Sequence, residues 1–309
     1  MKIVVAEPLG VKKERIHEVF DRCIPMGSVD LEIWETPPSD GEEWLKRCVD
    51  ADILVEVNHP LDRDFFEKCE KIRFVAVAFA GIDHIDTKVC AEKGIEIGNC
   101  PGYSASAVAE LVFGLIAALK RRIISMDGAV REGGTRNGFV GTEICGKRFG
   151  IVGYGHIGKK VAALAKAYGC EVLVSTRRPG EEEGVSFVSL EKLLRSCDIV
   201  SLHLPLTEES RGLIDKEKIA WMKEGAILIN TARGAIVDSI ALAEAVESGK
   251  LAGAAVDVFE TEPPLAEDHP LLRSEKIVVT PHIGFATEEA FEARLEMSSK
   301  NIAAFIAGR

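Results

Sequence analysis

Three side chains of complementary chemistry follow three apolar runs in the last third of the chain. Arg233 follows AILINTA, Glu262 follows AAVDVFET, and His282 follows KIVVTP. An arginine offers a planar pair of donors to a carboxylate, and a histidine exchanges a proton near neutral pH. A carboxylate beside that histidine stabilises its charged form. Together these residue types predict the reduction of a 2-oxo acid, or the reverse oxidation of a 2-hydroxy acid.

In this hypothesis Arg233 binds the substrate carboxylate, His282 protonates the oxygen that becomes an alkoxide, and Glu262 supports the imidazolium. Each residue alone has a structural alternative. Arg233 could stabilise a loop. Glu262 lies beside Pro263 and could belong to a turn, and His282 could cap a helix. Because the carboxyl ends of parallel strands converge on one crevice, the set as a whole favours the catalytic interpretation.

A glycine-rich stretch predicts the site of a hydride carrier. GIVGYGHIGKK has the spacing G-x-G-x-x-G at Gly153, Gly155 and Gly158, between the strand-like run RFGIVG and a helical pattern. This is the strand–turn–helix context of a dinucleotide site. Gly153 permits the tight turn, Gly155 leaves room for the pyrophosphate, and Gly158 lets the helix pack on the sheet. The helix N-terminus attracts phosphate. A structural turn without a ligand is the alternative.

The tip of the next strand distinguishes the two nicotinamide dinucleotides. About 20 residues after the motif an acid would accept hydrogen bonds from the ribose hydroxyls, but the chain reads Ser175-Thr176-Arg177-Arg178 there. Guanidinium groups bind a 2′-phosphate, so this tip favours NADP, with NAD possible. The alternative is that both arginines are solvated surface charges, partly neutralised by the acidic run EEE at 181–183.

Strand-like apolar runs alternate with helical patterns along most of the chain, which predicts parallel sheets covered on both faces. A first series fills the first hundred residues, a long helix follows from about Ser104 to Met126, and a second series begins near residue 148. The predicted fold is therefore α/β, with two doubly wound parallel-sheet domains. The strand candidates are KIVVAE, LEIW, DILVEV, RFVAVAF and IEIGN, then RFGIVG, EVLVST, IVSLHL, AILINT, AGAAVDVF and KIVVTPH.

Length and composition limit the classes of function. A length of 309 residues suggests about two domains, and the net charge of −11 argues against a nucleic-acid partner. Eight cysteines are dispersed without CxxC pairs, which is typical of reduced thiols in a cytoplasmic protein without a metal site. The chain begins MKIVVAEP, without a leader. Its most apolar run, at 108–119, is too short for a membrane span and contains Glu110, so we expect no membrane partner.

Several motifs in order resemble one known family. The second half of the chain contains GIVGYGHIG, HLPLT, NTARGAIVD, AAVDVFETEPP and TPHIG, and the first domain contributes AGIDHID and NCPGYSASAVAE. In this order, and over nearly the whole chain, they resemble the D-isomer-specific 2-hydroxyacid dehydrogenase family. The resemblance implies the catalytic roles given above to Arg233, Glu262 and His282.

The resemblance also implies a domain organisation and further contacts. A flavodoxin-like substrate-binding domain would comprise residues 1–99 and 283–309, and a Rossmann dinucleotide-binding domain would be inserted at 100–282. Ala80 and Gly81 would bind the substrate carboxylate through their backbone amides, beside Arg233 and His282. Two copies would form a homodimer through the nucleotide domain, where the long helix lies. The cofactor contacts would come from Gly153, Tyr154, Gly155, His156, Ile157, Gly158, Thr176, Arg177, Arg178, His203, Pro205, Thr207, Thr231, Ala232, Arg233, Asp257, His282 and Gly284.

One departure from the commonest family pattern bears on cofactor and substrate. The acid after the second nucleotide strand is missing, as in the NADP-using glyoxylate/hydroxypyruvate reductases, so we expect an enzyme of that type. The chain ends at Arg309 without a regulatory extension, which weakens an assignment to the D-3-phosphoglycerate enzymes. Formate-oxidising relatives have glutamine in place of Glu262, which argues against formate. The alternatives are a D-3-phosphoglycerate-type or other 2-hydroxyacid dehydrogenase, and a non-enzymatic, dinucleotide-sensing protein like the corepressors of the family.

Overall fold

The computed structural model describes residues 1–24, 27 and 29–308 of the chain. They form two compact units, which comprise Met1–Ser104 with Ala286–Arg309 and Ala105–Phe285. The boundaries expected from the sequence, after residues 99 and 282, lie a few residues before these. Each unit is an α/β structure built on one parallel sheet, as predicted.

The first unit contains a five-stranded sheet in which every neighbouring pair is parallel. Its buried strands are continuous apolar runs, because helices cover both faces. The strand order 2-1-3-4-5 reverses direction between β1 and β3, and ligands of such sheets bind at the carboxyl ends of the strands near that point. In spatial order the strands are β2 (Asp30–Ile33), β1 (Lys2–Val5), β3 (Ile53–Glu56), β4 (Phe74–Val77) and β5 (Glu96–Gly98).

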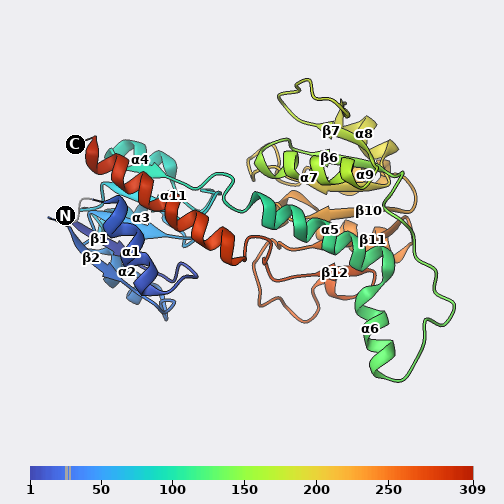
Figure 1. The fold of residues 1–309 in the computed structure, drawn as a ribbon, viewed down its shortest axis with the longest axis horizontal. Helices are drawn as coiled ribbons and strands as arrows, with labels where there is room; N and C mark the ends of the chain where they lie inside the picture. The colour runs from blue at the N-terminus through green and yellow to red at the C-terminus, as the bar shows by residue number, and fades with distance from the viewer. Residues whose placement is uncertain (25–26, 28, 309) are drawn as a thin grey trace. The chain divides into compact units, whose positions relative to one another are not determined.

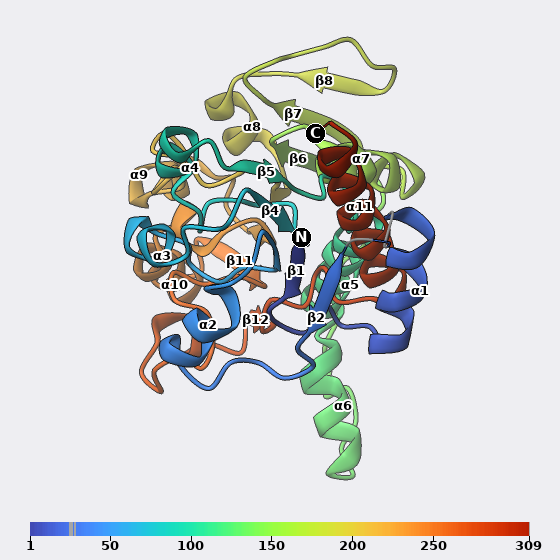
Figure 2. The ribbon, with the colours of Figure 1, turned by 90° about the vertical axis from the view of Figure 1, so that its left-hand side faces the viewer.

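Figure 2 shows α1 and α11 on one face of this sheet and α2, α3 and α4 on the other. Aspartates at the N-caps of α2, α3 and α4 accept hydrogen bonds from first-turn amides, which fixes where these helices begin. Helix α1 buries Ile16, Val19 and Phe20, whose spacing places them on one face. The helices are α1 (Lys13–Cys23), α2 (Gly41–Cys48), α3 (Arg63–Lys68), α4 (Thr87–Lys93) and α11 (Glu288–Ala307).

The second unit contains a seven-stranded parallel sheet, one strand more than the sequence predicted. The missed strand is β8, an edge strand of three residues in which only partly buried and exposed positions alternate, so no apolar run marks it. In spatial order the strands are β12 (Ile277–Val279), β11 (Leu251–Val256), β10 (Ala226–Asn230), β9 (Ile199–Leu202), β6 (Arg148–Val152), β7 (Glu171–Ser175) and β8 (Val185–Phe187).

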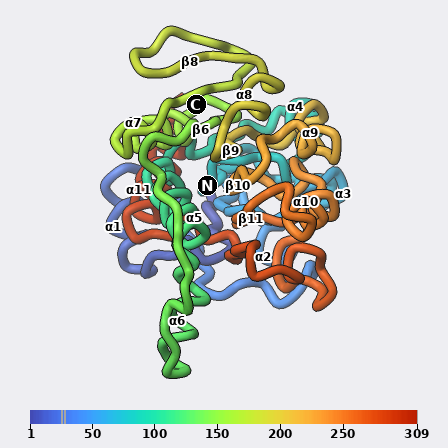
Figure 3. The backbone as a smooth tube through the Cα atoms, turned by 90° about the vertical axis from the view of Figure 1, so that its right-hand side faces the viewer, coloured from blue at the N-terminus to red at the C-terminus, as the bar shows by residue number. Residues whose placement is uncertain are grey.

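Two apolar cores cover the two faces of this sheet. One core contains Phe113 and Ile116 of α5 with Val161 and Ala165 of α7, and Figure 3 shows these helices on the same side of the strands. The other core includes apolar side chains of α8, α9 and α10. The helices of this unit are α5 (Ala105–Arg121), α6 (Ile123–Arg131), α7 (His156–Ala167), α8 (Leu190–Ser196), α9 (Lys216–Trp221) and α10 (Ser239–Glu247), with short 3₁₀ turns at Gly234–Ile236 and Pro270–Leu272.

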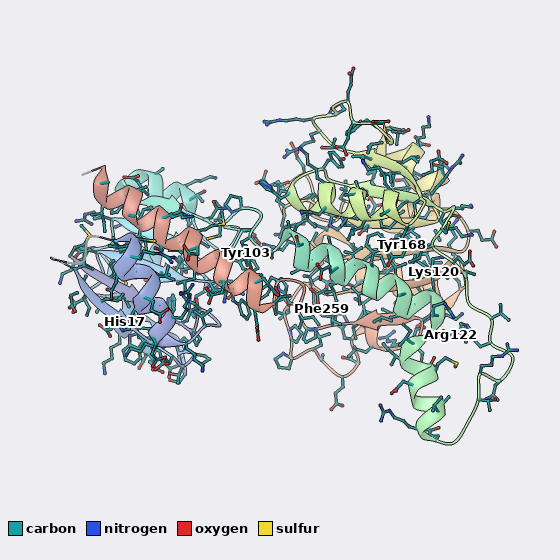
Figure 4. All side chains as sticks on the ribbon, viewed as in Figure 1. His17, Tyr103, Lys120, Arg122, Tyr168 and Phe259 are labelled. Atoms are coloured by element: carbon teal, nitrogen blue, oxygen red, sulfur yellow. The ribbon has the colours of Figure 1, made fainter. Side chains whose placement is uncertain are left out.

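The single helix predicted from Ser104 to Met126 is wrong, because the chain turns between α5 and α6. Arg122, labelled in Figure 4, has a left-handed backbone with φ of 48°, which no continuous right-handed helix accommodates. Helix α6 buries none of its residues, and Figure 1 shows it extending with the following segment away from the sheet of its unit. Within the described part of the chain, no helix combines the length and the apolar character that a membrane crossing requires.

Candidate active site

The glycine motif lies at the carboxyl end of β6, where the chain turns into α7. Gly153 has φ of 94°, and a Cβ added there would lie 2.2 Å from the carbonyl oxygen of His203. A Cβ on Gly158 would lie 2.3 Å from the carbonyl oxygen of Gly153. The fold itself therefore requires glycine at these two positions. A Cβ on Gly155 would meet nothing within 4 Å, so the open space at Gly155 suits the close approach of a ligand.

A cavity of about 880 Å³ opens beside this turn, entirely within the second unit. The structure brings most of the predicted cofactor residues of the glycine turn, the β7 tip and the loop after β9 to this cavity. His156, Ile157 and Gly158 form the start of α7 next to it. The lining residues are Val152, Gly153, Tyr154, Gly155, Ser175, Thr176, Arg177, Arg178, Leu190, His203, Leu204, Pro205, Thr207, Glu209, Ser210 and Leu213.

Two predicted cofactor residues carry enclosed polar atoms without a protein partner among the described residues. They are Nδ1 of His203 and Oγ1 of Thr231. The other ring nitrogen of His203, Nε2, lies 2.8 Å from Oγ of the buried Ser201, and burial lowers the pKa of His203 to about 3. The ring is therefore neutral near pH 7. Because buried polar atoms in native proteins almost always have a partner, these atoms fit a ligand with hydrogen-bonding groups, such as a dinucleotide.

The arginine at the tip of β7 is paired, though not with the acidic run after it. Nη1 of Arg177 lies 3.1 Å from Oε2 of Glu209, in the loop after β9. Within the acidic run, Glu182 instead accepts hydrogen bonds from the Tyr154 hydroxyl at 2.6 Å and from Lys166 at 3.0 Å. In the alternative interpretation residues 181–183 would neutralise the arginines, but the acidic partner of Arg177 comes from a loop far away in sequence.

The three predicted catalytic residues follow three neighbouring strands of the sheet, β10, β11 and β12. Nδ1 of His282 lies 3.1 Å from Oε1 of Glu262. Of the His282 side chain 19% is exposed, and of the Glu262 side chain 44%. Glu262 and His282 are 20 residues apart in the chain, and the adjacency of β11 and β12 brings their side chains together.

His282 has a left-handed backbone, with φ of 53°, which Asp257 holds in place. The carbonyl oxygen of Asp257 accepts from the His282 amide at 2.8 Å. Its carboxylate accepts from the Thr280 hydroxyl at 2.5 Å and from the amides of Ile283 and Gly284 at 2.9 and 2.8 Å. The side chain is buried, and burial raises its pKa. Asp257, expected as a cofactor contact, therefore orders the turn that presents His282.

Arg233 lies at the start of a 3₁₀ turn that the Asn230 side chain fixes. The Asn230 amide group donates to the carbonyl oxygen of Arg233 at 3.0 Å, and its Oδ1 accepts from the Ala232 amide at 3.1 Å. A Cβ on Gly234 would lie 1.9 Å from the backbone of Phe259, so the turn packs directly on the chain after β11. The partly buried Arg233 donates from Nη1 to the Ala232 carbonyl oxygen at 2.8 Å.

The loop that carries Glu262 is anchored at its base. Glu260 accepts a short hydrogen bond from the hydroxyl of Ser239, the first residue of α10, and lies 3.7 Å from Nε2 of His269. The ring of His269 also meets Phe259 edge-on. A second cavity, of about 540 Å³, lies between this loop and the start of α10. These contacts tie the loop to the body of the unit on either side of Glu262.

The predicted carboxylate-binding segment of the first unit follows β4. Ala80 is held through its carbonyl oxygen, which accepts from the Asn99 side chain at 2.7 Å.

The fully buried Glu56 lies at the carboxyl end of β3 in the same unit. Its Oε1 and Oε2 lie 3.0 and 3.2 Å from Nε2 of His84, and Glu56 accepts from the His59 amide at 3.1 Å. Burial raises the pKa of Glu56. Glu56 was not predicted, although a lone acid inside the apolar run ILVEV was its signal.

The described residues contain no group of three or more His, Cys, Asp or Glu side chains arranged to hold a metal ion.

Comparison with known proteins agrees with this geometry. Residues 113–284 match the family described as D-isomer specific 2-hydroxyacid dehydrogenase, NAD binding domain. The chain is 41% identical to a glyoxylate reductase from Korarchaeum cryptofilum, covering 90% of this chain and 87% of the relative. It is 38% identical to a D-3-phosphoglycerate dehydrogenase from Methanocaldococcus jannaschii, covering 95% of this chain and 55% of the relative. The crystal structure of the TT0316 protein from Thermus thermophilus superposes with a TM-score of 0.90 at 34% identity, covering 100% of this chain and 98% of that one. The chain therefore belongs to the D-isomer-specific 2-hydroxyacid dehydrogenases, oxidoreductases that act on CH–OH groups and bind a nicotinamide dinucleotide.

Proposed function

We propose that this chain reduces small 2-oxo acids such as glyoxylate and hydroxypyruvate to 2-hydroxy acids, with NADPH as the favoured reductant. The observation that carries the proposal is the 3.1 Å contact between His282 and Glu262. It joins a proton-exchanging ring to a carboxylate in the unit that contains the dinucleotide cavity. Arg233 follows β10, which lies beside β11 in the same sheet, and adds a cation for an acidic substrate.

Each residue has a separate role in this proposal. The dinucleotide, when bound, supplies the hydride. Arg233 binds the substrate carboxylate. Glu262 contacts Nδ1 of His282 and stabilises the imidazolium, and Nε2 then delivers the proton to the carbonyl oxygen. In the oxidative direction, the neutral ring takes the proton of the hydroxyl group.

The preference for NADPH rests on the lining of the larger cavity. Thr176, Arg177 and Arg178 line it at the carboxyl end of β7, and none of these residues is an acid. Guanidinium groups form charge-assisted, often bidentate, hydrogen bonds to phosphate. A 2′-phosphate on the adenosine ribose therefore gains more at this tip than a 2′-hydroxyl group does.

The substrate preference rests on the reductases among the relatives that the chain resembles. Glyoxylate reductases from Korarchaeum cryptofilum and Thermococcus litoralis are 41% and 39% identical to this chain, a hydroxypyruvate reductase from Thermotoga maritima is 40% identical, and the D-3-phosphoglycerate dehydrogenase is 38% identical. We therefore favour an unphosphorylated acid of two or three carbons. D-3-Phosphoglycerate and its 2-oxo counterpart are the second candidate pair.

Steady-state rates test the proposal directly. Glyoxylate, hydroxypyruvate, pyruvate and phosphohydroxypyruvate are each assayed with NADH and with NADPH, and we expect the highest kcat/KM for glyoxylate or hydroxypyruvate with NADPH. The highest value for phosphohydroxypyruvate would establish the second candidate. Absence of turnover with every acid and both nucleotides would contradict the enzymatic proposal and favour a dinucleotide-sensing protein.

We also propose that the active form is a homodimer that pairs through α6. This helix buries none of its residues, and it exposes Ile123, Ile124 and Val130 by 51%, 64% and 69%. Such a group of exposed apolar side chains is typical of an interaction surface. An Ile124→Asp variant should shift the mass measured by light scattering from dimer to monomer. Ile240 is exposed by 64% as well, so Ile240→Asp is the matched control and should leave the mass unchanged.

We propose a cytoplasmic location, which the state of the cysteines supports. All eight are free thiols, and five of them are buried. Burial raises the pKa of Cys69 and Cys197 to about 12, which keeps these thiols protonated and unreactive. Such thiols suit a reducing compartment.

A further inference from the structure

The carboxylate that is missing from the tip of β7 is supplied by another loop. Glu209 follows β9, and its Oε2 lies 3.1 Å from Nη1 of Arg177. Both residues line the cavity that holds the glycine turn. The guanidinium group expected to bind a 2′-phosphate therefore already has an acidic partner inside the same cavity.

The turn that carries Glu209 is firmly built although the glutamate itself is exposed. The buried Ser210 donates from its hydroxyl to the Pro205 carbonyl oxygen at 2.7 Å, and Oγ of Ser210 accepts from the Thr207 amide at 2.7 Å. The amide of Ser210 donates to the Thr207 hydroxyl at 3.2 Å. The backbone at Glu209 is thus fixed beside the cavity, and only its side chain can move.

The pair contributes little to the stability of the fold. Both side chains are 76% exposed, and exposed ion pairs of this kind contribute little to stability. A contact this weak breaks readily when a competing anion arrives. A phosphate has more charge and more acceptor oxygens than a carboxylate and can displace Glu209 from Arg177.

We propose that Glu209 is a specificity-determining residue that permits NADH binding and limits the preference for NADPH. Bound NADH leaves the Arg177–Glu209 pair intact, and the Glu209 carboxylate accepts hydrogen bonds from the ribose hydroxyls. Bound NADPH places its 2′-phosphate on Arg177, and Glu209 turns away toward solvent. This inference rests on the proposed nucleotide site, and it predicts measurable binding of both nucleotides.

Equilibrium titration of the whole protein with NADH and NADPH, without a substrate acid, tests the proposal. Glu209→Gln should bind NADPH more tightly and NADH more weakly, which raises the ratio of their affinities about tenfold. Arg177→Gln should lower that ratio by a similar factor. In the Arg177→Gln background, Glu209→Gln should tighten NADPH binding much less, because the pair no longer exists.

Glu208→Gln is the matched control, since Glu208 is an exposed neighbour with the same charge that does not line the cavity. The control should change the affinity ratio less than twofold. An unchanged ratio in Glu209→Gln, or an equal change in Glu208→Gln, would overturn the inference while the proposed enzyme stands. Failure of the unaltered protein to bind either nucleotide would overturn the proposed function itself.

Discussion

The two parallel sheets of this chain use their carboxyl ends in opposite ways. In the second unit that edge is open: it borders a cavity of about 880 Å³, exposes Arg177, and encloses polar atoms of His203 and Thr231 that have no protein partner among the described residues. In the first unit the acidic groups at that edge are paired within the unit. Glu56 is fully buried against His84 and the His59 amide.

Two further contacts lie at the carboxyl edge of the first sheet: a stack of two rings and a hydrogen bond to a second acid. The His59 ring stacks on Trp44 with centroids 3.9 Å apart, and Glu7 accepts from the Val57 amide at 2.8 Å. Burial raises the pKa of Glu7 as well as that of Glu56. At the carboxyl edge of the first sheet, Glu7 and Glu56 thus find hydrogen-bond partners within the unit. Four experiments test this difference, from the largest expected effect to the smallest.

Removal of the His282 ring should have the largest effect, at the open edge. In a His282→Asn variant we expect kcat to fall about 10²- to 10⁴-fold, the usual contribution of a general acid. Asparagine is chosen because it tolerates the positive φ of this position better than other residues do. Nucleotide affinity, measured by titration, should change little. Turnover near that of the unaltered enzyme would contradict the assignment of His282 as proton donor.

Two alanine substitutions separate a glycine that the fold needs from one that the ligand needs. Gly153→Ala should lower the free energy of unfolding by about 2–4 kcal/mol, because of its positive φ and the contact with His203. Gly155→Ala should fold with nearly unchanged stability but bind NADPH at least about tenfold more weakly. Urea denaturation and nucleotide titration measure the two effects. Unimpaired NADPH binding by Gly155→Ala would show that the pyrophosphate does not approach this turn.

At the closed edge, loss of Glu56 should destabilise the protein rather than remove a ligand contact. Glu56→Ala leaves the buried His59 amide and the His84 ring without their acceptor, at a cost of about 1–3 kcal/mol. Urea denaturation measures this cost, with Glu35→Ala as an exposed control. Equal stabilities of the two variants would mean that the internal pairing of this edge contributes nothing to folding.

The pH dependence of stability should differ in sign between the two edges. Folded His203 has a pKa of about 3, below its usual 6.5, so from pH 6.5 down to about 3 only the unfolded ring binds a proton. His203 therefore lowers stability as the pH falls through that range, by up to about 1.4 kcal/mol per pH unit. The raised pKa values of Glu7 and Glu56 act oppositely, since the folded carboxyls bind protons first.

Urea denaturation between pH 7 and pH 5 measures this dependence. A His203→Gln variant should lose less stability on acidification than the unaltered protein does. If both proteins lost stability equally, His203 would not be held neutral in the folded state.

Much of the fold could be predicted from local pattern. The strands that carry the glycine turn and the predicted catalytic trio are continuous apolar runs, and a parallel sheet aligns their carboxyl ends whatever the details of the loops. The failures have a different origin. Strand β8 is too short and too exposed to show a pattern, and the turn at Arg122 interrupts a sequence that remains compatible with helix on both sides.

The unpredicted parts of the sites depend on contacts between distant loops. Glu209 reaches Arg177 from a position 32 residues away, and Glu56 reaches His84 across 28 residues. Nothing in either neighbourhood specifies its partner, because strand order, which the local sequence does not encode, brings the loops together. Asp257 was predicted as a cofactor contact. Only the hydrogen bonds of the folded turn show that it orders His282.

The predicted catalytic trio follows three consecutive strands, after which Arg233, Glu262 and His282 lie. This arrangement has a consequence for how such chains diversify. All three belong to one continuous segment, Ala105–Phe285, together with the glycine turn. On the roles proposed above, the proton donor and the glycine turn are therefore inherited as one block. On the same proposal, a chimaera that joins this segment to the flanking parts of another member of the family would keep both.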